Sequence, residues 1–551
     1  MDTNFLAELL FPNIKTTPAD MEALYPPRNL PEGAKVTRFA PSPTGFMHLG
    51  NLYGALADER MAHLSDGVFY LRIEDTDDKR TVENGVALII SALEKFDLHF
   101  DEGATADGDN GAYGPYRQSE RKNIYQTYAK ELVKNGYAYP CFCTEEELAA
   151  NRAEQEAQKL TPGYYGKWAV WRDAEIEKIK EKLDAGMPFV LRFRSEGDCN
   201  NKLKFTDMIK GVIDVTENDI DHVLLKSDGI PTYHFAHAVD DHLMRTTHVV
   251  RDESWLSTLP FHIQLFKALG FKMPKYCHTA QVLKNDGGGK RKLSKRKDPE
   301  AALTYYHEQG YPANAVKEYL LTLLNSNFEE WRLANPAMPL EKFEFSPKKM
   351  SISGCLFSFE KLNDVSKNVI SALSAAEVVD AVIAWAKEYD PEFASTLEAD
   401  RAYAESIFAI GRGGNKPRKD ITVWGDAKPY VSFFYDKYFT CKYFTCTETL
   451  SASPEDVKNV LDGFVSVWQE SDDQTVWFDK IKAVGEQNGY CPNMKEYKKD
   501  PTGWKGSVGD VSAFLRVAVT GKTVSPDLYT VMNILGAEKV IARINSFKET
   551  L

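Results

Sequence analysis

The chain has 551 residues and a mass of 62.2 kDa, which is more than one hydrophobic core usually holds, so about two to four domains are expected. With 43% hydrophobic and 27% charged residues, its composition is that of a globular protein. The 67 lysine and arginine residues and the 80 aspartate and glutamate residues give a net charge of −13, which excludes a simple basic coat for nucleic acid. An RNA partner would therefore need locally positive surfaces.

The first residues do not combine a basic start with an apolar block, and no apolar run approaches the roughly 20 residues that cross a bilayer. We therefore expect a cytoplasmic protein with no membrane partner. The eight cysteines follow no disulfide pattern, so reduced thiols are expected. Residues 1–34 contain the passage YPPRNLPEG, whose prolines exclude helix and central strand, and we interpret them as an extension packed on the outside.

Residues 35–136 begin with a β-compatible stretch at 36–40, followed by a turn rich in proline and glycine that ends at His48, where a helix begins. A strand, such a turn and a helix N-terminus together form an anion site, because unpaired backbone N–H groups and the positive end of the helix dipole face the turn. The same turn also fits plain connectivity between a strand and a helix. Further strand and helix patterns at 68–74 and 82–96 predict a parallel α/β sheet with its ligand at the carboxyl ends of the strands.

The alternation of strands and helices is interrupted at residues 137–226, which begin with a short strand and a helix capped by Thr144. We interpret this segment as an insertion into the sheet. Cys141 and Cys143 are half of a zinc site, but no further thiol follows before Cys199. Because a structural zinc ion needs about four ligands, no zinc is expected.

Residues 227–282 return to the sheet, with a helix expected at 259–269. His234, His237 and His242 could suggest a metal site, yet no set of carboxylates and histidines in the right helical register accompanies them. An amino-acid pocket is the better interpretation.

Residues 284–297 carry seven lysines and arginines and a single acid around three consecutive glycines. A basic run is usually a solvated segment, and here the glycines predict a mobile loop. Helices are expected at 301–309 and 313–324, and the pattern becomes all-helical from residue 371. A second basic stretch at 412–419 is predicted to contact phosphates.

Two motifs, in this order, carry a family resemblance. The run TRFAPSPTGFMHLGN at 37–51, followed by RIEDTD, resembles the first signature of class I aminoacyl-tRNA synthetases, and KLSKR at 292–296 resembles the second. In this form they are similar to the bacterial type of glutamyl-tRNA synthetases. Asn51 stands where the first signature usually ends in histidine. The resemblance is strong over residues 37–364 and weaker over the remainder.

The resemblance implies an α/β fold, with a Rossmann-like class I synthetase catalytic domain, an inserted acceptor-binding domain and, after them, an all-helical anticodon-binding region. It divides the chain into an N-terminal extension, a first catalytic half, a connective insertion that binds the tRNA acceptor end, a second catalytic half, a KLSKR loop with a stem-contact region, and the helical region. These parts span residues 1–34, 35–136, 137–226, 227–282, 283–370 and 371–551, respectively.

It also implies the reaction, which is the ATP-dependent ligation of L-glutamate to tRNA-Glu through a glutamyl-adenylate, with transfer to the terminal ribose 2′-OH. The expected partners are tRNA-Glu, L-glutamate and ATP, and a monomer is expected. ATP brings Mg²⁺, for which the sequence offers no dedicated cage of protein ligands.

A free amino acid with a carboxylate side chain presents two anions and one cation, so its pocket needs arginines and one carboxylate. Arg251 is expected to select glutamate over glutamine, because a buried guanidinium that faces a neutral amide lacks a charge partner. His237 stands where many relatives carry asparagine. By resemblance, the glutamate site consists of Arg38, Ser42, Glu74, Tyr233, His237 and Arg251. The ATP site consists of Ala40, Thr44, His48, Gly50, Leu293, Ser294 and Lys295. The catalytic residues are His48, Asn51, Lys292 and Lys295.

Four other classes of protein share part of this sequence pattern. A glutaminyl-tRNA synthetase usually lacks an arginine at the place of Arg251 and carries a β-rich anticodon domain, so the helical tail argues against it. The short glutamyl-queuosine enzyme and other nucleotidyltransferases of the superfamily do not need residues 371–551. A catalytically inactive RNA-binding or scaffold protein would not need to keep His48, Lys292 and Lys295.

Overall fold

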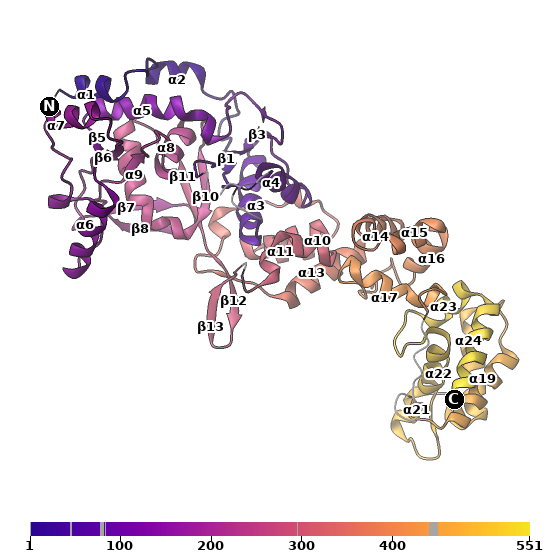
Figure 1. The fold of residues 1–551 in the computed structure, drawn as a ribbon. Coiled ribbons are helices and arrows are strands. Elements are labelled where there is room, and N and C mark those ends of the chain that lie inside the picture. Colours follow the sequence, from indigo (N-terminus) through magenta and orange to yellow (C-terminus); the bar gives the residue numbers. More distant parts are fainter. Residues whose placement is uncertain (1, 44–46, 78–81, 83, 295, 440–449) are drawn as a thin grey trace. The chain divides into compact units, whose positions relative to one another are not determined.

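The computed structural model describes residues 2–43, 47–77, 82, 84–294, 296–439 and 450–551 (Figure 1). The chain forms two compact units. Unit 1 consists of Met1–Tyr305 and Val316–Phe359, and unit 2 consists of Tyr306–Ala315 and Glu360–Leu551. None of the described helices combines the length and the apolar character that a membrane span requires.

A parallel sheet forms the centre of unit 1. Strand β1 (Val36–Phe39) pairs with β2 (Val68–Leu71), and β2 pairs with β3 (Glu102–Ala104), both in parallel, while β4 (Asp109–Asn110) adds an antiparallel edge. Strand β10 (His248–Asp252) pairs in parallel with β11 (Lys275–Thr279).

A backbone bond from Thr247 N to Val36 O, 2.9 Å long, joins the two sets of strands, so the order is β3, β2, β1, β10, β11. This is the order of a doubly wound sheet. The strands that directly follow β1 in the chain, β2 and β3, lie on one side of it, and β10 and β11 lie on the other. A ligand crevice opens at such a switch point.

Helices connect these strands. They are α3 (Leu49–His63), α4 (Gly85–Glu94), α5 (Lys122–Lys134), α8 (Tyr233–Leu243) and α9 (Leu259–Leu269). Helix α3 forms where Leu52 and Leu56 recur at helical spacing, and both are buried against the sheet. Gly67 lies between α3 and β2. A Cβ there would lie 1.9 Å from Lys35 O, so the close approach of the two backbones requires glycine. Helix α9 spans the residues that the sequence predicts.

The insertion has its own small sheet, in which β6 (Val190–Phe193) lies between β5 (Ala138–Cys141) and β9 (Val223–Leu225), all antiparallel. Helix α6 (Glu145–Ala157) starts with the predicted cap, since Thr144 accepts a bond from Glu147 N at 3.2 Å. Helix α7 (Ile176–Asp184) follows it, and the strands β7 (Lys202–Asp207) and β8 (Gly211–Thr216) form a hairpin.

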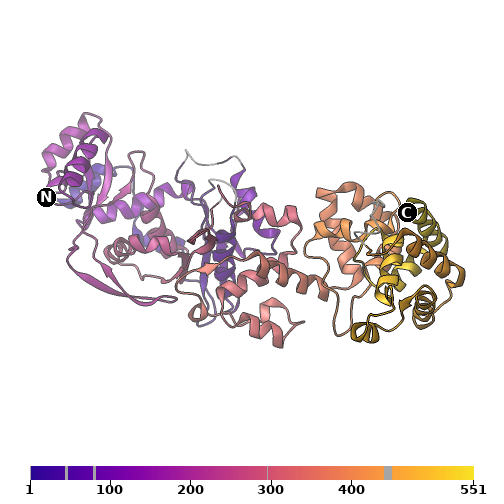
Figure 2. The ribbon, with the colours of Figure 1, turned by 90° about the horizontal axis from the view of Figure 1, so that it is seen from below.

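The N-terminal extension contains two helices, α1 (Thr3–Leu10) and α2 (Pro18–Leu24), which contact α5. Lys130 Nζ on α5 lies 2.8 Å from Glu8 Oε2 and 2.8 Å from Ile14 O. Arg28 follows the helices and donates twice to Glu102, at 2.8 and 2.9 Å. In Figure 1 the N-terminus lies next to α1 and close to α7 and β5. Figure 2 also shows it beside purple helices of unit 1. The extension is therefore bonded to the rest of unit 1 along its length.

The glycine-rich basic stretch forms a hairpin, not the loop predicted from its glycines. Strand β12 (Val282–Asp286) pairs with β13 (Gly289–Lys292) in antiparallel and with β14 (Cys355–Leu356) in parallel. Two of the glycines fill the two-residue turn between the strands. The following helices are α10 (Leu303–Gln309), α11 (Ala313–Leu324), which has the predicted bounds, and α12 (Phe328–Ala334).

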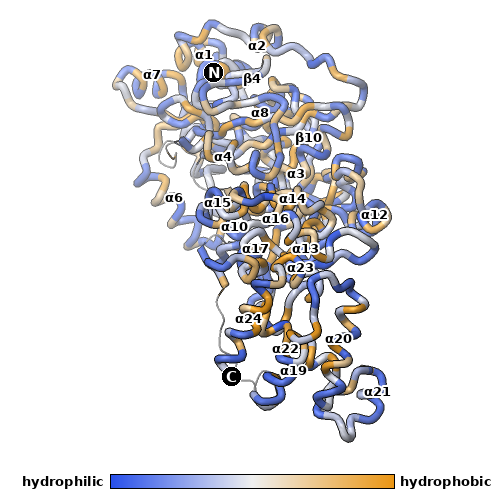
Figure 3. The backbone as a smooth tube through the Cα atoms, turned by 90° about the vertical axis from the view of Figure 1, so that its right-hand side faces the viewer, coloured by the Kyte–Doolittle hydropathy of each residue, from blue (hydrophilic) through white to orange (hydrophobic). Residues whose placement is uncertain are grey.

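Unit 2 is built on a core of apolar side chains from its helices. A short parallel pair, β15 (Tyr490–Cys491) and β16 (Gly506–Ser507), is the exception to the predicted all-helical pattern among the described residues. Orange apolar stretches alternate with blue polar ones along α24 (Figure 3). The helices are α13 (Phe359–Ala372), α14 (Ala375–Tyr389), α15 (Pro391–Ala399), α16 (Arg401–Phe408), α17 (Ala427–Val431), α19 (Pro454–Val467), α20 (Gln474–Gln487), α21 (Met494–Lys499), α22 (Val508–Thr520), α23 (Leu528–Leu535) and α24 (Ala537–Thr550).

Candidate active site

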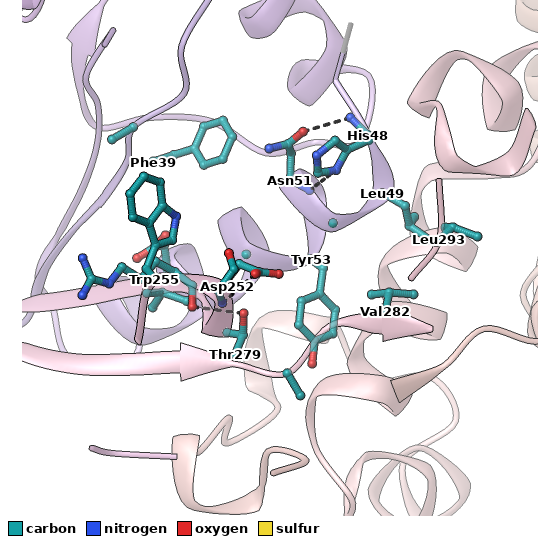
Figure 4. Close-up of a pocket in the computed structure, with 18 of the residues that line it drawn as sticks. Phe39, His48, Leu49, Asn51, Tyr53, Asp252, Trp255, Thr279, Val282 and Leu293 are labelled. Atoms are coloured by element: carbon teal, nitrogen blue, oxygen red, sulfur yellow. Dashed lines mark hydrogen bonds between the residues drawn. The ribbon is translucent and has the colours of Figure 1, made fainter. Parts of the chain in front are cut away.

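A cavity of about 380 Å³ opens in unit 1 where the strand order reverses. Arg38 and Arg251 are the next-to-last residues of β1 and β10, so both arginines reach it from the carboxyl ends of adjacent strands. In Figure 4, Phe39 and Trp255 lie on one side of the cavity and Val282 and Leu293 on the other. The predicted residues that line the cavity are Arg38, Ala40, His48, Gly50, Asn51, Glu74, Tyr233, Arg251, Lys292 and Leu293.

His48 caps the N-terminus of α3 at the edge of this cavity. Its Nδ1 accepts a bond from Asn51 N at 3.1 Å, and its backbone N–H donates to Asn51 Oδ1 at 3.0 Å (Figure 4). An imidazole nitrogen that accepts an N–H bond carries no hydrogen, so in the neutral ring the hydrogen is on Nε2. A Cβ at Gly50 would lie 3.1 Å from His48 Nδ1, which favours glycine there. The cap thus turns His48 into a donor beside the positive end of a helix.

Glu74 is the carboxylate of the cavity. It is 9% exposed, and Arg72 Nη2 donates to it at 3.2 Å. Burial raises the pKa of Glu74 to about 7, against the opposing charges of Arg72 and Arg38. Arg38 Nε donates to Asp241 Oδ1 at 3.4 Å. Burial by itself would raise the pKa of Asp241, but Arg72 and Arg38 outweigh it and hold that pKa well below its usual range.

Arg251 is 8% exposed and carries the cavity's second guanidinium. Its Nε donates to His278 Nε2 at 3.0 Å, and its Nη1 lies 3.2 Å from His262 Nδ1. The guanidinium carbon lies 4.5 Å from the centre of the Tyr276 ring. Nη2 is buried, and none of the described residues forms a hydrogen bond with it. A buried cationic donor at a cavity wall is suited to bind a carboxylate.

The two sequence motifs meet at this cavity. Leu303 N donates to Met47 O at 3.1 Å, and His48 forms a bridge with Ala302, so the segment after the basic hairpin lies against the start of α3. Lys292, at the end of β13, lines the same cavity, and its Nζ lies 3.4 Å from Asp252 Oδ2. Segments about 250 residues apart therefore share one site.

The described residues include no group of three or more histidine, cysteine, aspartate or glutamate side chains able to hold a metal ion. At the half zinc site, Cys143 Sγ instead lies 3.6 Å from the hydroxyl of Tyr164. The prediction that no zinc binds remains a prediction.

Comparison with known proteins agrees with this geometry. The model of the catalytic domain of class I tRNA synthetases (E and Q) matches residues 35–353, and an anticodon-binding domain model matches residues 502–548. A glutamate–tRNA ligase of Acetivibrio thermocellus is 52% identical over 545 residues, which are 99% of each chain, and one of Clostridium perfringens is 46% identical over 544 residues, 98% of this chain and 99% of the other. The chain belongs to the glutamate–tRNA ligase family. A crystal structure of the glutamate tRNA ligase of Elizabethkingia meningosepticum in complex with its amino acid has a TM-score of 0.75 at 28% identity, covering 94% of this chain and 99% of that one.

Membership in the glutamate–tRNA ligase family confirms the predicted fold class, a class I catalytic domain followed by a helical C-terminal region with an anticodon-binding domain. The glutaminyl alternative is not supported, since the full-length relatives named above are glutamate–tRNA ligases. The predicted domain boundaries remain predictions.

Some residues predicted from the family do not line the cavity. His237 is fully buried behind it, with Nε2 at 2.8 Å from the Tyr276 hydroxyl and Nδ1 at 2.8 Å from Asp241 Oδ2. Burial lowers the pKa of His237 to about 4, although Asp241 acts in the opposite direction, so the ring is neutral. In the conformation described, His237 therefore contacts Asp241 and does not line the cavity, and its predicted contact with the amino acid remains a prediction.

Two more predicted residues lie beside the cavity without lining it. Ser42 is exposed, and Ser294 donates its backbone N–H to Asp298 Oδ2 at 2.9 Å. Asp298 is 2% exposed and also accepts a bond from Arg291 Nη2 at 2.8 Å, so it fixes the turn after β13. The predicted residues Thr44 and Lys295 lie outside the described part of the chain.

The sequence analysis missed several lining residues, of which Asp252 and Trp255 are the most informative. The Trp255 ring packs on Tyr233 with centroids 4.3 Å apart, and Asp252 holds Lys292 as described above. Both lie in the run RDESW at 251–255, which begins with the predicted Arg251, so their closeness to Arg251 in the sequence was the available signal. Tyr53, Asp58 and Thr279 also line the cavity, and no local pattern marks them.

Two of the basic side chains at 412–419, a stretch predicted to contact phosphates, are engaged within the fold. Arg412 is half-buried and donates to three carbonyls, those of Phe408 at 3.1 Å, Ile370 at 2.5 Å and Leu373 at 2.9 Å. These carbonyls lie at or near the C-terminal ends of α13 and α16, so Arg412 satisfies helix ends. Arg418 donates twice to Asp420, at 2.6 and 2.9 Å.

We expect Arg412→Ala to lower the free energy of unfolding by about 2 kcal/mol, because charge-assisted bonds to carbonyls near two helix ends are lost. Thermal unfolding of the full chain measures this change. Lys416→Ala is the matched control, since it removes an exposed charge from the same stretch and should leave the melting temperature unchanged. Equal melting temperatures for the two variants would contradict the capping role.

Proposed function

We propose that this chain ligates L-glutamate to tRNA-Glu in two steps that consume ATP. One observation carries the proposal: Arg251 has a buried guanidinium nitrogen that bonds to no residue in the described part of the chain, at a cavity that Glu74 and His48 also line. A side-chain carboxylate, an ammonium group and a phosphate would each meet a group of suitable charge there. Full-length similarity to glutamate–tRNA ligases supports the same reaction.

In the first step, an oxygen of the glutamate α-carboxylate attacks the α-phosphorus of ATP, and the bond to the pyrophosphate oxygen breaks. The side-chain carboxylate binds Arg251, the ammonium group binds Glu74, and Arg38 attracts the remaining negative charge. Little covalent chemistry falls to the protein, so rate enhancement comes from positioning and from donors aimed at the developing charge.

His48 supplies such a donor. With Nδ1 engaged in the cap of α3, the donor of the neutral ring is Nε2–H, which would donate to a phosphate oxygen bound at the helix mouth. The Asn51 side-chain oxygen is engaged in the cap, so its predicted assistance comes from its NH₂ group. Lys292, released from Asp252, and the predicted Lys295 neutralise the departing pyrophosphate.

A magnesium ion bound with ATP would neutralise charge on the phosphates. Among the described residues, no group of three or more histidine, cysteine, aspartate or glutamate side chains could hold it.

In the second step, the terminal ribose 2′-OH attacks the carbonyl carbon of the adenylate, the bond to the phosphate oxygen breaks, and AMP leaves with the hydroxyl proton passing to solvent. We assign the acceptor end of the tRNA to the insertion at 137–226, its stem to 283–370 and its anticodon to 371–551. We also propose that the enzyme works as a monomer in the cytoplasm, where translation enzymes meet tRNA.

The test is charging of purified tRNA-Glu and tRNA-Gln with labelled glutamate, side by side and with ATP. Labelled glutamyl-tRNA-Glu is the expected product. ATP–pyrophosphate exchange with and without tRNA distinguishes an inactive scaffold from an enzyme. Absence of both exchange and charging would overturn the proposal, and charging of tRNA-Gln as well would broaden it to both tRNAs.

Binding of glutamate should weaken as the pH falls through about 7. Glu74 must be ionised to attract the ammonium group, and its pKa in the empty site is about 7, so the ionised fraction falls about tenfold between pH 8 and pH 6. The glutamate side chain does not titrate in this range. We expect the KM for glutamate in ATP–pyrophosphate exchange to rise about tenfold over this interval, with little change in the KM for ATP.

Glu74→Gln is the control, because an amide of the same size cannot titrate. Its KM for glutamate should be raised at every pH and should lose the dependence between pH 6 and pH 8. A variant that keeps the wild-type pH profile would show that another group titrates.

A further inference from the structure

Two histidines contact the guanidinium of Arg251, His262 on α9 and His278 on β11. Arg251 Nε donates to His278 Nε2 at 3.0 Å, and Arg251 Nη1 lies 3.2 Å from His262 Nδ1. A guanidinium can only donate, so both ring nitrogens must accept and neither can carry a hydrogen. Both histidines are fully buried, and burial lowers the pKa of each.

The far nitrogens of both rings have partners that fit this assignment. His278 Nδ1 lies 2.7 Å from Asp207 Oδ2, which accepts, and His262 Nε2 lies 2.9 Å from His234 Nδ1. With hydrogens on the far nitrogens, His278 donates to Asp207 and His262 donates to His234. Asp207 is itself anchored, since Ile209 N and Lys210 N donate to its other oxygen at 2.9 Å each. Each acceptor ring is thus locked in one tautomer by a second bond.

Because both acceptors are neutral, they do not cancel the positive charge of Arg251. Among the described residues Arg251 forms no ion pair with a carboxylate, whereas Arg38 lies beside Asp241 and Arg72 beside Asp241 and Glu74. Imidazoles orient the guanidinium without cancelling its charge, and the Tyr276 ring covers one face at 4.5 Å. Nη2 has no hydrogen-bond partner within the ranges that the structure describes. An aspartate at either histidine position would instead satisfy the arginine and weaken its attraction for a ligand.

We propose that His262 and His278 are positioning residues that determine specificity for an acidic amino-acid side chain, by holding Arg251 through uncharged acceptors. This inference rests on the proposed binding of glutamate at Arg251. Neither histidine lines the cavity, so both act through the arginine and do not touch the substrate.

The test compares His262→Leu with His262→Asn in ATP–pyrophosphate exchange, with glutamate, glutamine and ATP each varied. Leucine fills the space without an acceptor, whereas the asparagine oxygen stands close to the place of Nδ1. We expect His262→Leu to raise the KM for glutamate about tenfold or more and to lower the preference for glutamate over glutamine, with the KM for ATP changed less than about twofold. His262→Asn should recover most of the loss.

Matched variants separate positioning from stability. His248 is a buried histidine on the same strand as Arg251, bonded to Thr247, and His248→Leu should leave the KM for glutamate unchanged even if it lowers the melting temperature. His278→Gln tests the second acceptor in the same way. It should keep most of the affinity for glutamate, because its amide oxygen can take the place of Nε2.

The outcomes are distinct. If the wild type does not use glutamate, the proposed function fails. If the wild type uses glutamate and Arg251→Ala does not, while His262→Leu and His262→Asn both match the wild type or both lose equally, the positioning role is overturned.

Discussion

Replacing Arg251 by alanine is expected to raise the KM for glutamate by at least about a hundredfold and to abolish the preference for glutamate over glutamine. Arg251 is 8% exposed, and its Nη2 has no partner among the residues described. A bound side-chain carboxylate would therefore gain a charge-assisted bond in a site from which water is largely excluded. Loss of such a buried pair typically costs several kcal/mol, and a hundredfold corresponds to about 2.7 kcal/mol. Affinity for tRNA should remain, because Arg251 lines the small-molecule cavity.

ATP–pyrophosphate exchange with varied glutamate and glutamine measures this effect. Arg28→Ala is a suitable control, since Arg28 is another partly buried arginine of unit 1 and is bonded to Glu102 away from the cavity. Arg251→Lys keeps a charge but not the planar fork, so its KM for glutamate should stay well above that of the wild type. A wild-type KM for Arg251→Ala would exclude the assigned role.

Replacing His48 is expected to lower the rate of adenylate formation by about a hundredfold to a thousandfold, with a smaller effect on the KM for glutamate. Removal of one donor to a developing charge typically has this magnitude. His48 also caps α3, so His48→Ala would combine a catalytic loss with the loss of a helix cap, about 1 kcal/mol.

His48→Asn separates these two roles. Asparagine is a good N-cap residue and keeps an acceptor for Asn51 N, but it has no donor at the place of Nε2. We expect this variant to melt within a few degrees of the wild type and to remain as slow as His48→Ala in single-turnover formation of the adenylate. Recovery of the wild-type rate in His48→Asn would show that the cap alone matters.

Local patterns predicted the elements whose formation is local. Helix α3 begins next to His48 because Leu52 and Leu56 already repeat at helical spacing, and the hydrogen bonds of the cap connect residues 48 and 51. The hairpin at 282–292 was not predicted. Its first strand, β12, pairs with β14 at Cys355, far along the chain, so this pairing depends on the tertiary fold.

The site was predicted in part, and mainly through family motifs. Arg38, Glu74 and Arg251 were identified from RFAPSPTG, RIEDTD and RDESW, and all three line one cavity. His262 and His278 belong to no motif, since their contact with Arg251 arises from the packing of α9 and β11 around β10. The bonds of Arg412 to carbonyls could not be predicted, because charge in the sequence does not show which carbonyls the fold brings near it.

The most direct measurement is a crystal structure of the protein with a non-hydrolysable glutamyl-adenylate analogue. It should show the side-chain carboxylate within hydrogen-bond distance of Arg251 Nη2, the ammonium group at Glu74, and the group that replaces the phosphate beside His48 Nε2. An analogue bound with its side-chain carboxylate away from Arg251, or outside the cavity between β1 and β10, would contradict the proposed site.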